Sequence, residues 1–391
     1  MVAGEPSGDR LGAGLLRALQ EEGPVEAIGI GGTELTEAGL ESIAPMAALT
    51  MHGIIEPLLR LPGVWRLLRM VERRVVDAKV DAFIGVDFNV FNLILERRLK
   101  RRGITTVHYV SPSVYAWRRG RIARLAKSAD LLLTLFPFEP ALYAGQPLRA
   151  VFVGHPLADE IDPQVDDSVR RTQARAELGV GEDELLICVM PGSRRSEIGY
   201  MLQPFLAAAR EFRRQQPTAT FVVPCATEAL QARIMEAVAQ GDNADLPVRV
   251  VGDRARQVLA ASDAALVKSG TSTLEAMLLG IPMVVGYRLG AVSYQLIKRL
   301  IRTPFIALPN ILSGRALVPE LLQGDMQPAL LAAELGRQLG DAPRAQLRHA
   351  FARLHDELRC AASTQSAREV RALVQPPQQV QEMLKLQKEP T

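Results

Sequence analysis

The segment from Asp263 to Tyr287 constrains the fold of this 391-residue chain more than any other. An apolar run at 264–267 predicts a buried strand, and a hydroxyl-rich turn follows at 269–273. Residues 274–279 predict a helix that Gly280 ends, and 282–285 predict a second strand. Strand, loop, helix and strand in this order form a parallel βαβ unit. The unit predicts an α/β fold with an anion-binding loop at a helix N-terminus.

The loop of this unit carries side chains that suit a nucleotide diphosphate. Backbone amides and three hydroxyls would hold the phosphates, and Glu275 on the first helical turn would accept bonds from ribose hydroxyls. Alternatively, Ser and Thr cap the helix and Glu275 completes a capping box. The order of the unit resembles the nucleotide-sugar site of two-domain glycosyltransferases of the GT-B architecture.

A second glycine turn follows the strand predicted at 185–190. It contains Gly192, Ser193 and Arg194, and Arg194 is expected to make a charge-assisted bond to a diphosphate. The alternative is a structural ion pair of Arg194 with Glu197 or Glu275. Further strands at 221–224 and 248–251 alternate with helical stretches, which is the order of a Rossmann-like domain.

Length and composition predict an ordinary globular protein of two domains. A chain of 391 residues exceeds one usual core, while 48% hydrophobic and 23% charged residues are typical values. The three cysteines form no CxxC or Cys/His pattern, which argues for a reducing compartment and against a structural zinc site. The sequence contains no run of 18 apolar residues that would predict a membrane span.

The N-terminus is a glycine-rich turn that leads into an amphipathic helix. Such a turn normally follows a strand of about five apolar residues, so we expect a longer first strand that begins upstream of Met1. Glu5, Ser7 and Asp9 would line the mouth of a cleft at the end of this strand. The alternative is that Ser7 and Asp9 only cap the helix.

Residues 51–76 combine apolar side chains with arginines. This mixture suits the headgroup boundary of a membrane, although a core-facing amphipathic helix explains the leucine spacing equally well. The lipid-facing or membrane-facing candidates are Ile55, Leu58, Leu59, Trp65, Leu68 and Arg69.

Positive charge is concentrated in one part of the chain. Residues 60–127 contain sixteen Lys and Arg against five Asp and Glu, an excess of eleven. We do not expect nucleic acid as the partner, because no helix-turn-helix, RNP-like or zinc motif accompanies the charge. An anionic phospholipid or a phosphorylated substrate fits better, and a solvated basic face is the alternative.

Several motifs, in one order along nearly the whole chain, resemble the lipid-A-disaccharide synthase family. They are AGEPSGD (3–9), HYVSPSVYAWR (108–118), FPFE (136–139), GHP (154–156), PGSR (191–194), SGT (269–271), PMVVGYR (282–288) and LPN (308–310). The resemblance implies an inverting GT-B glycosyltransferase of lipid A (lipopolysaccharide) biosynthesis in a Gram-negative bacterium. It would join a UDP-2,3-diacylglucosamine donor to 2,3-diacylglucosamine 1-phosphate and release UDP.

The resemblance also assigns partners and places. It implies a peripheral enzyme at the cytoplasmic face of the inner membrane and a possible homodimer through the C-terminal helices. We expect no cofactor and no metal. The sequence has no Asp-x-Asp motif that could bind a metal. The residues assigned to UDP are Gly192, Ser193, Arg194, Ser269, Gly270, Thr271, Ser272, Glu275 and Asn310. We expect two Rossmann-like domains facing a cleft: an acceptor domain at 1–158 joined by C-terminal helices at about 342–374, and a donor domain at 169–341. A polar tail covers 375–391.

One position departs from the family's pattern. After the strand predicted to begin at Asp81, the family usually has Asp-Ala-Pro-Asp-Phe-Asn or Asp-Phe-Pro-Asp-Phe-Asn, and the second aspartate of that motif is the expected general base. Aligned with residues 87–92, that aspartate falls on Val90, which cannot accept a proton. The catalytic candidates are therefore Asp87, Glu5, Ser7 and Asp9. The alternatives are a catalytically weak or silent lipid- or UDP-binding homologue, or another UDP-sugar enzyme of the GT-B fold.

Overall fold

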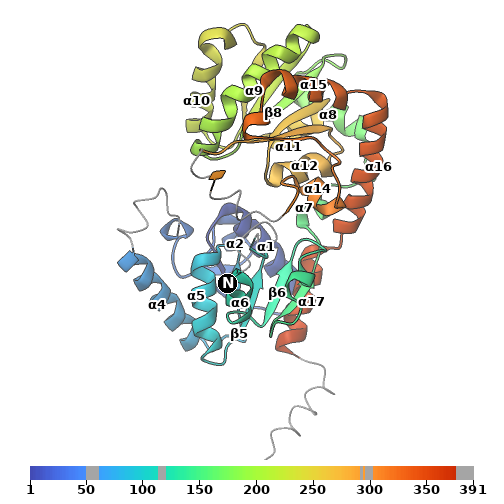
Figure 1. Cartoon of the computed structure of the whole chain (residues 1–391). Coiled ribbons are helices and arrows are strands. Elements are labelled where there is room, and N and C mark those ends of the chain that lie inside the picture. Colours follow the sequence, from blue (N-terminus) through green and yellow to red (C-terminus); the bar gives the residue numbers. More distant parts are fainter. Residues whose placement is uncertain (50–60, 113–119, 291–293, 296–302, 376–391) are drawn as a thin grey trace, which may run out of the picture. The chain divides into compact units, whose positions relative to one another are not determined.

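A computed structural model describes residues 1–49, 61–112, 120–290, 294–295 and 303–375 (Figure 1). The chain divides into two compact units, Met1–Asp159 with Leu358–Thr391, and Glu160–Glu357. The C-terminal helices were predicted to join the first domain from about residue 342. This boundary is wrong by one helix, because the first unit resumes only at Leu358. Helix α16 (Asp341–Leu358) belongs to the second unit, because Arg344 bonds to the backbone oxygen of Asp263 there.

The first unit is a parallel, doubly wound sheet. Its strands follow the order β1-β4-β5-β6-β7, and a bridge from Val2 to Ile30 joins β1 to the small parallel pair of β2 and β3. The chain thus winds in both directions from β1, as in Rossmann-like domains. The helices and strands are β1 (Val2–Ala3), α1 (Pro6–Glu21), β2 (Ala27–Gly29), α2 (Thr33–Glu37), β3 (Leu40–Ser42), α4 (Leu61–Asp77), β4 (Ala82–Val86), α5 (Asn89–Lys100), β5 (Thr105–Tyr109), α6 (Gly120–Ala126), β6 (Leu131–Thr134), β7 (Arg149–Phe152), α7 (Pro156–Glu160) and α17 (Ala362–Val374).

Helices cover both faces of this sheet. On one face, Leu15 of α1 and Val370 of α17 share a buried cluster with Val107 of β5, and α17 lies beside β6 in Figure 1. On the other face, Leu68 of α4 and Leu95 of α5 pack with strand residues of the same sheet. Burial on both sides explains why the strands are continuous apolar runs.

The second unit repeats this architecture. Its six parallel strands follow the order β10-β9-β8-β11-β12-β13, so the winding direction reverses between β8 and β11. The helices and strands are α8 (Asp167–Leu178), β8 (Leu186–Met190), α9 (Arg195–Gln215), β9 (Thr220–Cys225), α10 (Glu228–Ala239), β10 (Val248–Gly252), α11 (Ala255–Ala261), β11 (Ala264–Lys268), α12 (Thr271–Leu278), β12 (Met283–Tyr287), α14 (Leu308–Ser313), β13 (Glu320–Leu322), α15 (Pro328–Gln338) and α16.

The βαβ unit predicted from residues 263–287 is confirmed as β11, α12 and β12. Gly280 has a positive φ of 72°, which suits its place just after the helix. Of the predicted tail at 375–391, all but Gln375 lies outside the described residues. Within the described part of the chain, no helix is long and apolar enough to cross a membrane.

Candidate functional site

The point where the second sheet reverses its winding direction brings two predicted loops together. Met190 of β8 is paired with Val267 of β11, so the loop at 191–194 and the loop at 269–270 start side by side. Ligands of open α/β sheets bind in the crevice at such a switch point. The sequence-predicted donor residues Gly192, Ser193, Arg194, Ser269 and Gly270 all lie on these two loops.

Glu197 organises the first loop. Its carboxylate accepts hydrogen bonds from the backbone amides of Ser193 and Arg194 at 3.1 and 3.3 Å. Gly192 has a positive φ of 122°, and a Cβ there would lie 2.6 Å from the Glu197 carboxylate. The Arg194 side chain is 72% exposed, and its Nη1 lies 3.9 Å from Glu197 Oε1, which is a long distance for an ion pair. The amides of Ser193 and Arg194 are therefore occupied, whereas the exposed Arg194 guanidinium is accessible to an anion.

Lys268 is a second cation at this edge, which the sequence reasoning missed. Its Nζ donates to Glu197 at 3.0 Å and lies 5.4 Å from the centroid of the Tyr287 ring. Burial alone would raise the pKa of Glu197, but the bond and charge of Lys268 outweigh it and lower that pKa. Lys268 is the last residue of the buried strand β11, and this position in the sequence could have identified it as a site residue.

The hydroxyl-rich loop opens helix α12. Thr271 and Ser272 are its first residues, while the Ser269 hydroxyl donates to the backbone oxygen of Ile306 at 2.8 Å. Glu275 is partly buried and accepts a bond from Arg256 at 3.3 Å. The N-cap of α12 is Gly270, which has no side chain, so Glu275 does not form a capping box with it. A carboxylate held by one arginine keeps further lone pairs for ribose hydroxyls.

Asn310 is not available to a ligand, so its predicted role in binding UDP is wrong. The side chain is 0% exposed. Its amide nitrogen donates to the Val318 oxygen and to Glu320, and its amide oxygen accepts from the Leu317 and Val318 amides. Asn310 therefore holds its own loop together.

The first sheet has its own switch point between β1 and β4. Ala3 is paired with Val86, so the turns after these residues are neighbours, and a Cβ on Gly4 would lie 2.4 Å from the Phe88 ring. Glu5 and Ser7 are exposed at the start of α1. Candidate catalytic side chains thus meet at the edge where parallel sheets bind ligands.

Asp9 has a structural role, and its predicted place among the catalytic residues is wrong. It is buried, and its carboxylate accepts bonds from the amides of Gly32, Glu34 and Leu35 at 2.6, 3.0 and 3.3 Å. These amides open helix α2, whose N-terminus leaves them without helical partners.

A chain of hydrogen bonds runs from Asp87 into the core. The Asn89 amide nitrogen donates to Asp87 at 3.0 Å, and the Asn89 oxygen lies 3.3 Å from His108 Nε2. His108 Nδ1 lies 2.7 Å from Glu96, and both of these side chains are completely buried. The sequence reasoning assigned no role to Asn89, His108 or Glu96, because β5 and the middle of α5 meet only in the fold.

Burial and the charges of neighbouring groups shift the pKa of Asp87, Glu96 and His108. Burial raises the pKa of Asp87, and the charge of His108 with the bonds from Phe88 and Asn89 offsets only part of that. Burial also raises the pKa of Glu96. Burial alone would lower the pKa of His108, but the charge and bond of Glu96 outweigh it and raise that pKa. A protonated His108 donates to both Glu96 and Asn89.

Val90 lies on the first turn of α5, not on an extended strand. Asp87 and Phe88 have positive φ values of 47° and 45°, which end β4 and start the helix. Val90 is 69% exposed, so a carboxylate at this position would face solvent beside Asp87.

Three of the six residues predicted to face lipid lie on helix α4. Ile55, Leu58 and Leu59 lie outside the described residues. Trp65 is 44% exposed and Arg69 is also exposed. The prediction for Leu68 is wrong, because this side chain is 2% exposed and packs in the core of the first unit. One helix thus carries both a core face and an exposed face.

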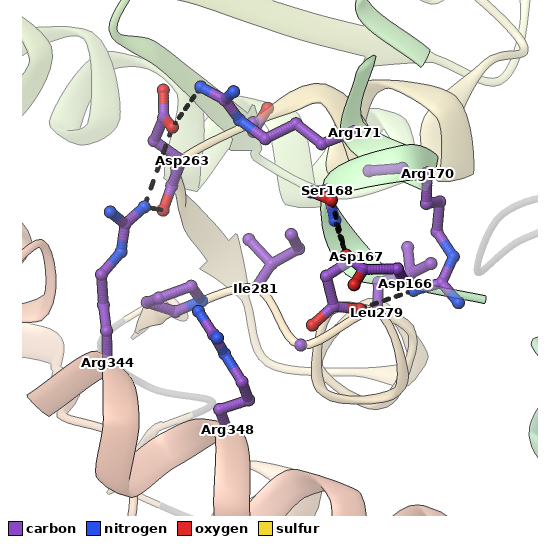
Figure 2. A pocket seen from close by; sticks show the side chains of 14 residues that line it. Asp166, Asp167, Ser168, Arg170, Arg171, Asp263, Leu279, Ile281, Arg344 and Arg348 are labelled. Carbon is purple, nitrogen blue, oxygen red and sulfur yellow. Dashed lines mark hydrogen bonds and ion pairs between the residues drawn. The ribbon is translucent and has the colours of Figure 1, made fainter. Parts of the chain in front are cut away.

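A pocket of about 340 Å³ at the opposite edge of the second sheet is a structural network (Figure 2). Asp263, just before β11, forms ion pairs with Arg171, Arg175 and Arg344. Asp167 is bonded to Arg170. The pocket lies at the amino ends of the strands, away from the switch point. Among the described residues, no group of three or more His, Cys, Asp or Glu side chains is arranged to hold a metal ion.

Two doubly wound units of parallel sheet and helices define the GT-B fold class. The fold resembles a glycotransferase of kitacinnamycin (TM-score 0.61, 16% identity, 93% of this chain and 95% of that one). It also resembles a putative UDP-N-acetylglucosamine 2-epimerase from Listeria monocytogenes (TM-score 0.62, 11% identity, 95% and 94%).

The chain belongs to the lipid-A-disaccharide synthetase family, whose model matches residues 1–373. A lipid-A-disaccharide synthase from Alcanivorax borkumensis is 42% identical over 377 residues, which cover 96% of this chain and 97% of that protein. The family and fold class predicted from the motifs are confirmed. The protein is a glycosyltransferase of lipid A biosynthesis, and the alternative of a silent binding homologue is not favoured.

Proposed function

We propose that this enzyme transfers 2,3-diacylglucosamine from its UDP carrier to 2,3-diacylglucosamine 1-phosphate, with inversion at the transferred carbon. The second unit binds the donor and the first unit binds the acceptor. The observation that carries the donor assignment is the meeting of Arg194, Lys268 and the start of α12 at one switch point. Two cations and a helix N-terminus stabilise the negative charge that develops on the departing diphosphate.

Asp87 is the base in this proposal. A sugar hydroxyl is too weak an acid to ionise at neutral pH, so its proton must be taken as the new bond to carbon forms. Asp87 lies at the end of a central strand, and burial raises its pKa, which makes its carboxylate a stronger base. Asn89, fixed by His108, holds the carboxylate by one oxygen. Glu5 and Ser7, on the neighbouring turn, are placed to bind hydroxyls of the acceptor sugar.

The enzyme acts at a membrane surface in this proposal, since both substrates carry acyl chains. The exposed Trp65 and Arg69 on α4 support a peripheral contact with the cytoplasmic face of the inner membrane. Homodimerisation through the C-terminal helices stays a prediction, and light scattering on the purified protein tests it.

A UDP-release assay tests the proposal. The purified protein receives the donor alone, the acceptor alone, and both together, and UDP and lipid products are measured in parallel. We expect UDP and disaccharide in equal amounts only when both substrates are present. UDP released at the same rate without acceptor indicates a hydrolase, and no release in any mixture contradicts the proposed transfer.

A further inference from the structure

An arginine-rich groove of about 390 Å³ lies in the first unit, beside the proposed base. It is formed by helices α4, α5 and α6, which Figure 1 labels. The lining residues are Trp65, Asn89, Val90, Leu93, Ile94, Arg97, Arg98, Arg101, Arg121, Arg124 and Ser128. The groove joins apolar and cationic side chains, and it begins at the residue that holds Asp87.

The two kinds of side chain are ordered along α5. Val90, Ile94, Arg97 and Arg101 follow one another at intervals of four, three and four residues, so they form a stripe on one face of the helix. At 1.5 Å per residue the stripe extends for about 16 Å. Its apolar end lies at Val90, next to the catalytic edge, and its cationic end lies away from it.

Three arginines of the groove carry positive charge that no ion pair of the described residues compensates. Five arginines line it and no acidic residue does, among the residues that the structure describes. Arg98 is paired with Glu72 at 2.7 Å, whereas Arg97, Arg101 and Arg124 are exposed and form no ion pair in the described ranges. Like charges collected in a concave site attract an anion of high charge.

We propose that this groove is the subsite for the phosphate of the acylated acceptor, an inference that rests on the proposed function. Arg97, with Arg101 and Arg124, binds the phosphate through paired N–H bonds, the geometry in which guanidinium matches phosphate. Ile94 and Trp65 cover the apolar start of an acyl chain. The sugar then lies on the Asn89 side of the bound phosphate, with its reacting hydroxyl toward Asp87.

Calorimetry with short-chain acceptors tests this subsite directly. Short-chain 2,3-diacylglucosamine 1-phosphate and the same lipid without its phosphate are titrated into the wild-type chain and into Arg97→Gln/Arg101→Gln. The control is Arg73→Gln/Lys127→Gln, which removes two exposed charges outside the groove. We expect the wild type and the control to prefer the phosphorylated lipid by at least about tenfold, as charge-assisted bonds imply. The groove variant loses this preference and binds the unphosphorylated lipid as before.

Three results would overturn the subsite. In the first, the groove variant keeps its preference for the phosphorylated lipid. In the second, the control loses as much of that preference as the groove variant does. In the third, the groove variant loses only its binding to phosphatidylglycerol vesicles. The last result identifies the groove as a membrane contact. Circular dichroism checks that both variants fold, and Arg97→Lys/Arg101→Lys, which retains charge without the fork, is expected to keep part of the preference. A wild type that binds selectively but releases no UDP contradicts the proposed transfer and leaves the subsite intact.

Discussion

Val90 combines an exposed apolar side chain with a place on the first turn of α5, beside the proposed base. A carboxylate there would lie on the first turn of the helix, where the helix N-terminus stabilises negative charge. We expect Val90→Asp to raise turnover at least roughly tenfold, at the low end of the contribution of a general base. UDP affinity should hardly change. Val90→Asn is the matched control without a base, and equal turnover in both variants contradicts a role for a carboxylate at this position.

The buried pair of Glu96 and His108 sets the charge beside Asp87. Glu96 raises the pKa of His108, and protonated His108 lowers the pKa of Asp87. In Glu96→Gln, burial dominates and His108 loses its proton, so the pKa of Asp87 rises. A base acts deprotonated, and therefore the acidic limb of the kcat/KM profile should move to higher pH.

A pH–rate profile of Glu96→Gln measures this shift. Glu72→Gln is the control, because Glu72 is also a buried carboxylate but pairs with Arg98 and Arg102. An acidic limb that stays in place, or moves to lower pH, would show that His108 does not act on the base.

Helix α4 has one face in the core and one face exposed to solvent. Leu68 lies on the core face, and Trp65, three positions earlier, lies on the exposed face. Leu68 is buried, so Leu68→Ala should lower the free energy of unfolding by about 2–5 kcal/mol. Trp65 is 44% exposed, so Trp65→Ser should leave stability within about 1 kcal/mol and weaken binding to anionic vesicles. Denaturant unfolding and vesicle sedimentation measure the two effects. Loss of stability in Trp65→Ser would place this side chain in the core instead.

The loops after β8 and β11 share Lys268. Because Lys268 holds Glu197 and Glu197 holds the Ser193 and Arg194 amides, Lys268→Gln removes a cation and loosens the loop together. We expect UDP to bind about tenfold more weakly, as for loss of one charge-assisted bond. Calorimetry checks this, with Arg194→Ala expected to act in the same direction. Unchanged UDP affinity in both variants would remove the donor site from this edge.

Local sequence patterns made the helices and strands predictable. The site was less predictable, because the roles of its residues depend on partners that are distant in the sequence. The βαβ unit at 263–287 is encoded by neighbouring residues, and so are the glycine turns that follow strands. Asn310 and Asp9 look like ligand-binding polar residues in sequence, but amides brought in by the fold occupy them. His108 and Glu96 gained a role only because β5 and α5 are adjacent. Leu68 and Trp65 share one amphipathic pattern, and only packing decides which side chain faces the core.

At the scale of the whole molecule, two doubly wound sheets each present a switch point with different chemistry. Cations, hydroxyls and a helix N-terminus occupy the switch point of the second unit, and carboxylates with polar hydrogen-bonding groups occupy that of the first. This division matches a reaction in which one partner leaves as an anion and the other must lose a proton. The proposed base, Asp87, lies in the first unit.

The rate of disaccharide formation by wild type and Asp87→Asn tests the central claim most directly. Mass spectrometry counts the disaccharide formed from both substrates, and calorimetry gives UDP affinity for the same preparations. We predict that the wild type forms the disaccharide, and that Asp87→Asn is slower by roughly 10² to 10⁴ with unchanged UDP affinity. A wild type that forms no disaccharide, or an Asp87→Asn variant as fast as the wild type, would contradict the account.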